Sequence, residues 1–192
     1  MNTHPKKRII TIAGQLGSGK SSTAKRVASE LGYTHFSSGD LFRAVATERN
    51  VSVEEINKMA ELEKEIDFTV DKRLREMNDQ ERLVIDSRTA FHWIPSSFKV
   101  YLSLNPHIAA ERIFNQIKNS GRASQSGESV EHVFKLTQER VASENKRYQD
   151  LYQLDVSDQG QYDLIIDTEH NDLDTVVLMV IKGYREYIDN RV

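Results

Sequence analysis

The segment from residue 14 to residue 21 constrains this chain more than any other part of its sequence. It reads G-x-x-x-x-G-K-S, with Gly14 and Gly19 setting the spacing and Lys20 and Ser21 following. In such a loop the glycines let backbone N–H groups turn inward around phosphate oxygens, the lysine adds a mobile positive charge, and the serine hydroxyl can ligate Mg²⁺. The segment therefore predicts binding of the polyphosphate of a nucleotide together with Mg²⁺.

The residues on either side of this loop support the prediction. Residues 8–13 form a short, β-branched apolar run, which is typical of a strand buried on both faces. Residues 21–31 carry apolar side chains at helical spacing, and Gly32 is a helix-stop signal. Strand, loop and helix in this order turn the loop amides and the helix N-terminus toward one anion. The alternative is a glycine-rich turn that merely connects strand to helix. The residues expected at the nucleotide are Gly14, Gln15, Leu16, Gly17, Ser18, Gly19, Lys20, Ser21 and Ser22.

Length and composition limit the remaining possibilities. At 192 residues the chain is long enough for one α/β domain and short for two. It has no apolar run near the roughly 18 to 20 residues that span a bilayer, and its polar start lacks an apolar signal core, so we expect a cytoplasmic protein without a membrane partner. The absence of cysteine excludes disulfides and Cys-based zinc sites, and the six histidines form no metal-binding spacing. A net charge of −3 argues against general nucleic-acid binding.

Alternating apolar patterns predict the architecture. Helical patterns separate the strand candidates, with a capping box at Ser52 and Glu55, Asn105 before Pro106, and Asp172 at the start of the last helix. This alternation predicts an α/β fold, a three-layer sandwich in which helices flank a five-stranded parallel sheet. The four strands expected after the first are residues 34–36, 83–85, 100–104 and 164–166.

Two segments interrupt the simple repeat. Residues 39–78 contain about three helical patterns, and residues 119–128 (NSGRASQSGE) form a polar loop before a long helix from 129 to about 151. Such insertions often carry substrate or close as lids. We expect one domain over 1–192. Its core would comprise residues 6–38, 79–118 and 129–192.

Two short strings place charged side chains where two strands end. In S-S-G-D-L-F-R, Arg43 lies one turn into a helix, from which it can project back toward the carboxyl edge of the sheet, where α/β sheets bind ligands. The alternative is a helix cap by Ser38 or Asp40 followed by a surface arginine. In I-D-S-R, Asp86 can hold Mg²⁺ or its waters and Arg88 can clamp an acceptor phosphate. The alternative here is an ion pair or a strand cap.

Three further charged residues share one face of the long helix, since Arg140, Glu144 and Arg147 recur at i, i+4 and i+7. The alternative is a surface ladder of salt bridges. Arg112 lies near the end of the preceding helix, and it too would be solvated unless its position brings it to the nucleotide. We interpret His92 and Trp93 as packing or loop residues, because transfer to an ionised phosphate needs no base.

Taken in order, the phosphate loop, S-S-G-D-L-F-R, I-D-S-R and E-R-V-A-S-E-N-K-R-Y resemble the nucleoside monophosphate kinases. Within these the chain is most similar to the short, archaeal-type cytidylate kinases, whose Y-D-x-x-I-x-T string matches residues 162–168. The likeness spans nearly the whole chain. It implies transfer of a phosphoryl group from ATP, with Mg²⁺, to CMP or dCMP. Small nucleotides would then be the only partners, and a monomer is favoured.

The resemblance also implies a role for each candidate residue. Ser38, Arg43 and Arg88 would hold the acceptor, with Asp40 beside them, while Arg140 and Arg147 would bridge donor and acceptor phosphates. Glu144 would meet the ribose, and Arg112 would lie against the donor. Residues 39–78 would form the monophosphate-binding insertion and residues 119–128 a short lid.

The chain departs from the family pattern at Ser87, where a glycine usually precedes the arginine, so the identity of the acceptor is left open. The alternatives are another small-molecule kinase on this fold, acting on AMP, UMP, shikimate or a nucleoside, or a nucleotide-binding regulator without turnover. A hydroxyl acceptor would need a base and fewer phosphate clamps, so Arg43 and Arg88 together argue against it.

Overall fold

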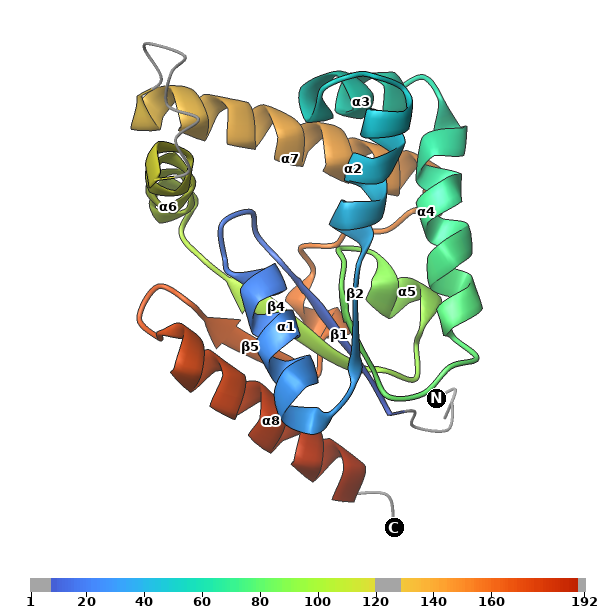
Figure 1. Cartoon of the computed structure of the whole chain (residues 1–192), viewed down its shortest axis with the longest axis vertical. Coiled ribbons are helices and arrows are strands. Elements are labelled where there is room, and N and C mark those ends of the chain that lie inside the picture. The colour runs from blue at the N-terminus through green and yellow to red at the C-terminus, as the bar shows by residue number, and fades with distance from the viewer. Residues whose placement is uncertain (1–7, 120–128, 190–192) are drawn as a thin grey trace.

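A computed structural model describes residues 8–119 and 129–189 of the chain. Within these residues, five strands form one sheet in the order β2-β3-β1-β4-β5, and every neighbouring pair is parallel. Helices lie on both faces of the sheet, so the three-layer α/β sandwich predicted from the sequence is confirmed (Figure 1). The strands are β1 (Ile9–Gly14), β2 (Thr34–Ser37), β3 (Leu83–Asp86), β4 (Phe98–Ser103) and β5 (Leu164–Asp167).

The helices begin and end close to the predicted residues. Gly32 ends α1 in the left-handed conformation, Ser52 and Glu55 form a reciprocal capping box on α3, and the Asp172 carboxylate caps α8 through Thr175 N–H at 2.8 Å. The region 39–78 contains the three expected helices. The helices are α1 (Lys20–Leu31), α2 (Ser38–Glu48), α3 (Val53–Ala60), α4 (Lys64–Met77), α5 (Ala90–Trp93), α6 (Pro106–Asn119), α7 (Val130–Tyr152) and α8 (Leu173–Asp189).

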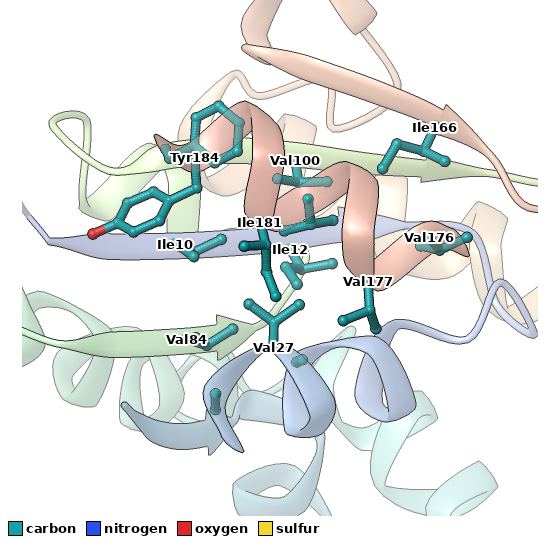
Figure 2. Close-up of a cluster of buried hydrophobic side chains, with 14 of the residues drawn as sticks. Ile10, Ile12, Val27, Val84, Val100, Ile166, Val176, Val177, Ile181 and Tyr184 are labelled. Atoms are coloured by element: carbon teal, nitrogen blue, oxygen red, sulfur yellow. The ribbon is translucent and has the colours of Figure 1, made fainter. Parts of the chain in front are cut away.

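Alternation along β1 divides the core into two layers. Ile10 and Ile12 face one side, where α1 and α8 bury Val27, Val177 and neighbouring apolar residues against the sheet (Figure 2). Ile9 faces the other side, which α4 and α5 cover. Because both faces are covered, the central strands read as continuous apolar runs.

Several segments were not predicted or lie outside the described residues. The sequence pattern did not reveal α5 or the 3₁₀ turn Gln159–Gln161, both of which are too short for a periodic signal. The proposed lid, apart from its first residue, lies outside the described residues. No helix in the two described ranges combines the length and the hydropathy needed to cross a bilayer.

Candidate active site

The loop between β1 and α1 has a backbone that only glycine fits easily. Gly14, Gly17 and Gly19 have φ angles of 139°, 73° and 84°, in the region that side chains rarely adopt. A Cβ on Gly14 would overlap the carbonyl oxygen of Leu102 on β4, and one on Gly17 would lie 2.9 Å from that of Ala109. No side chain caps α1, which leaves its first amides available to an anion. This geometry fits a nucleotide phosphate.

Lys20 lies folded into this loop. Its Nζ donates to the carbonyl oxygens of Gly14 at 2.9 Å and Gln15 at 2.7 Å. Burial, and then the nearby Arg88, lower the pKa of the Lys20 ammonium to about 7, although Asp86 opposes the shift. A phosphate anion at this position would restore the charged form.

A cleft of about 470 Å³ opens at the carboxyl ends of the strands, between the phosphate loop, α2 to α4 and α7. Most of the predicted site residues line it, although they come from four separate parts of the chain. Gly14 and Gln15 instead line a smaller cavity behind the loop, Ser18 is buried, and Asp40 and Arg112 lie outside the cleft lining. The predicted residues in the cleft wall are Leu16, Gly17, Gly19, Lys20, Ser21, Ser22, Ser38, Arg43, Asp86, Arg88, Arg140, Glu144 and Arg147.

Glu144 joins two of the predicted arginines. Its carboxylate forms an ion pair with Arg88 and accepts a hydrogen bond from Arg140 Nε at 2.8 Å. Burial lowers the pKa of both guanidinium groups, that of Arg140 to about 10, with Arg88 as the second cause. Glu144 is buried, so the alternative of a surface salt-bridge ladder is wrong. Glu144, Arg88 and Arg140 therefore form one charged cluster in the wall of the cleft.

Arg147 lies farther along α7 and is held by the insertion. Its Nε donates to Asp67 Oδ2 of α4 at 2.9 Å, and its Nη1 donates to Asn57 O of α3 at 3.3 Å and to Ser143 Oγ at 3.1 Å. Burial raises the pKa of Asp67, although Arg147 opposes this shift. Arg147 therefore lines the same cleft as Arg140 but ties α7 to α3 and α4.

The residues at the start of α2 differ in role. Ser37, rather than Ser38 or Asp40, caps the helix, because its hydroxyl accepts from Asp40 N–H at 3.3 Å. Ser38 Oγ is left to face the cleft wall, where it donates to Asp86 O at 3.4 Å. Arg43 forms an exposed ion pair with Asp40. Such an exposed pair stabilises little and is easily exchanged for a phosphate.

Asp86 provides a buried carboxylate beside the phosphate loop. It ends β3, is 5% exposed, and lies 3.4 Å from His35 Nε2. Among the residues that the structure describes, no three acidic, histidine or cysteine side chains are grouped so that they could hold a metal ion. Mg²⁺ commonly binds through one or two protein oxygens and the phosphates of its substrate, so Asp86 with the exposed Ser21 hydroxyl fits that ion.

Arg112 was misplaced by the sequence pattern. It lies in the middle of α6 rather than at its end, because the helix continues to Asn119. Its Nη2 donates to Thr168 O at 2.7 Å, beyond β5, and its side chain is outside the cleft lining. The structure thus brings it to the loop after β5 and not to the other arginines.

Several polar residues of the cleft were missed. Asn57, Asp67 and Asp71 line it from α3 and α4, and their only sequence signal is a pair of acids four residues apart. Asp71 accepts hydrogen bonds from Trp93 Nε1 at 2.9 Å and from Tyr152 OH. Trp93 is therefore a packing residue, as expected, and it also orients an acid in the cleft wall.

The parallel sheet, the glycine loop and the charged cleft at the carboxyl edge define a P-loop kinase. Two solved structures share this fold, a gluconokinase from Sinorhizobium meliloti 1021 (TM-score 0.61, 16% identity, 97% of both chains covered) and a shikimate kinase from Bacteroides thetaiotaomicron (TM-score 0.61, 15% identity, 91% of this chain and 96% of the other). A family model described as AAA domain matches residues 13–131.

Relatives by sequence are more specific. A cytidylate kinase of Methanosphaera stadtmanae is 33% identical over 91% of this chain and 96% of its own length. A cytidylate kinase of Pyrococcus abyssi is 37% identical over 83% of this chain and 84% of its own. The chain belongs to the cytidylate kinase family, as its motifs indicated.

Proposed function

We propose that this enzyme transfers the γ-phosphoryl group of ATP to CMP or dCMP, giving ADP and CDP or dCDP. The observation that best supports this function is that Arg43, Arg88 and Arg140 all line the cleft that contains the phosphate loop. Three cations beyond the loop lysine suit a second phosphate. The named function of the relatives supports CMP as the acceptor.

The chemistry explains the need for these cations. An anionic phosphate must approach an anionic γ-phosphoryl group, so catalysis consists almost entirely of positioning and charge neutralisation. Lys20 would hold the β- and γ-phosphates, Arg43 and Ser38 the acceptor phosphate, and Arg88 and Arg140 the group in transfer. Arg147 would add its positive charge from its place beside Asp67, and Glu144 would meet the ribose.

Mg²⁺ would be held by Ser21, by Asp86 or waters on it, and by the phosphates, and it would supply further neutralisation of the triphosphate. In this proposal the partners are small nucleotides alone, and the enzyme acts as a monomer that binds neither nucleic acid nor membrane. A kinase with a hydroxyl acceptor remains the second candidate, since the fold is shared with shikimate kinase. With a hydroxyl acceptor, Arg43 and Arg88 would have no acceptor phosphate to bind.

The direct test is ADP release with CMP, dCMP, UMP, AMP and GMP as acceptors. We expect CMP and dCMP to be the best substrates. Inactivity with all five, in protein that binds ATP, would contradict the proposal and favour the silent regulator or a kinase with a hydroxyl acceptor.

The role of Arg88 is tested by Arg88→Ala. We expect turnover to fall roughly 10²-fold or more with little change in ATP affinity, because its contacts are made to the group in transfer. Arg26→Ala is the matched control, since Arg26 is half-exposed and pairs with Asp174 on α8. Weaker ATP binding with unchanged turnover would instead place Arg88 on the donor side.

A further inference from the structure

The cleft is polarised along its length. The phosphate-loop end contains Lys20, Arg88 and Arg140. The α3 and α4 end presents hydrogen-bond acceptors from Asn57 and Asp67, beside the guanidinium group of Arg147. A nucleoside monophosphate placed with its phosphate among the cations therefore directs its base toward α3 and α4. The chemistry of that wall decides which base edge it accepts.

Asp67 has one oxygen engaged and one available. Oδ2 accepts from Arg147 Nε, whereas Oδ1 accepts no hydrogen bond from any residue in the described ranges. The carboxyl group is nevertheless largely buried, with a side-chain exposure of 8%. Because Asp67 lines the cleft, its second oxygen is open to a hydrogen-bond donor brought by a ligand.

Asn57 adds a second acceptor nearby in the wall. Its Nδ2 donates to Val53 O at 2.8 Å, which fixes the orientation of the amide, and its Oδ1 is buried without a partner among the described residues. Asn57 is 7% exposed, and its own backbone carbonyl accepts from the arginine that holds Asp67. Two unused acceptors thus border the same end of the cleft.

Acceptors on the protein require donors on the base. Cytosine presents a 4-amino donor where uracil presents a carbonyl oxygen, and carboxylates accept hydrogen bonds from that amino group. We infer that Asp67, assisted by Asn57, is the residue that selects an amino base over a keto base in the acceptor site. This inference rests on the proposed function, because it assumes a monophosphate acceptor whose phosphate lies at the arginines.

The test is Asp67→Asn, with kcat/KM measured for CMP and UMP. Since Arg147 can only donate, the new amide keeps its oxygen on Arg147 and turns its NH₂ toward the cleft, so the wall changes from acceptor to donor. We expect the ratio of kcat/KM for CMP to that for UMP to fall about 10-fold or more. If Asp67 only positions Arg147, both substrates lose the same factor and the ratio stays constant, which would overturn the inference.

Asp71→Asn is the matched control, one turn along α4. Both Asp71 oxygens already accept from Trp93 and Tyr152, so we expect this variant to lose stability while the CMP to UMP ratio stays within about twofold. A fall in the ratio as large as that of Asp67→Asn would assign selection to α4 in general and refute the specific role of Asp67.

A second measurement avoids substitution altogether, in case Asp67→Asn does not fold. The unmodified enzyme is given the monophosphate of the pyrimidin-2-one nucleoside, which lacks the 4-amino group. A lower kcat/KM than for CMP supports the inference, and an equal value overturns it while leaving the proposed function intact. Inactivity of the unmodified enzyme with every monophosphate would instead remove the proposed function on which the inference rests.

Discussion

The buried cluster around Glu144 yields the sharpest prediction for stability. In the absence of ligand, this carboxylate is the group that separates and neutralises the guanidinium groups of Arg88 and Arg140. Glu144→Gln keeps the size and shape of the side chain but removes its charge. Two buried cations are then left facing an uncharged amide.

The magnitude follows from the burial of the pair. The side chains of Glu144 and Arg88 are only 6% and 13% exposed, so solvent screens their attraction weakly. The hydrogen bond from Arg140 to Glu144 involves charged groups, which contribute about 1.5 to 3 kcal/mol, and the 36% exposure of Arg140 places its share at the low end of that range. We expect Glu144→Gln to lower the free energy of unfolding by about 1 to 3 kcal/mol, which is roughly 3 to 10 °C in Tm for a chain of this size.

The assay is thermal unfolding followed by circular dichroism, with and without inorganic tripolyphosphate. The polyanion would supply the charge that the variant lacks, so the difference in Tm between the variant and the unmodified enzyme should narrow when it is added. This probe has no sugar, so a contact of Glu144 with ribose plays no part. Glu139→Gln is the control, because Glu139 is 60% exposed and lies 3.9 Å from Lys135. Equal Tm values for the two variants, or a difference that widens with tripolyphosphate, would refute the reasoning.

Two further predictions concern the phosphate loop. Gly14→Ala should lower Tm by several degrees and weaken binding of an ATP analogue. The φ of 139° costs an alanine about 1 to 3 kcal/mol, and the new Cβ overlaps a β4 carbonyl oxygen. Gly160→Ala, in an exposed turn, is the control, and equal Tm values for the two variants would contradict this account. Lys20 should take up a proton when the analogue binds. Its pKa of about 7 in the empty site lies below that of the unfolded chain, so at pH 8 it is mostly neutral and uptake approaches about one proton, whereas at pH 6 it is already charged and uptake is small. For the same reason the stability contributed by Lys20 is lowest below pH 7 and rises between pH 7 and about 10.5. Calorimetry in buffers of different ionisation enthalpy measures the uptake, and equal heats at pH 8 in all buffers would exclude it.

The sheet and the donor side of the cleft were predictable because their signals are local. The loop at 14–21 has a fixed spacing, the strands beside it are continuous apolar runs, and the capping residues Ser52 and Asp172 lie next to the helices that they begin. Each of these patterns depends only on neighbours in the sequence. The helices and strands that such patterns predict therefore occur in the structure, with ends shifted by one or two residues.

The acceptor side was less predictable because its contacts are made across long stretches of sequence. Asp67 meets Arg147 across 80 residues, and no spacing rule connects them. Arg112 was placed near the end of its helix, whereas the helix continues for seven more residues, to Asn119, where the predicted polar segment begins. Ser37 was overlooked as the cap of α2 because three polar residues compete for that position within four residues.

The helix α7 joins the two ends of the enzyme mechanically. Its 23 residues extend for about 34 Å, and Figure 1 shows them crossing from α6 to the group of α2, α3 and α4. At one end the His107 and Phe134 rings stack 4.1 Å apart between α6 and α7, and at the other Arg147 is anchored to Asp67. A rigid helix that is held at both ends passes a tilt at one end on to the other. We therefore expect closure of α3 and α4 around an acceptor to move α6 as well, which would couple the binding of the two substrates through α7.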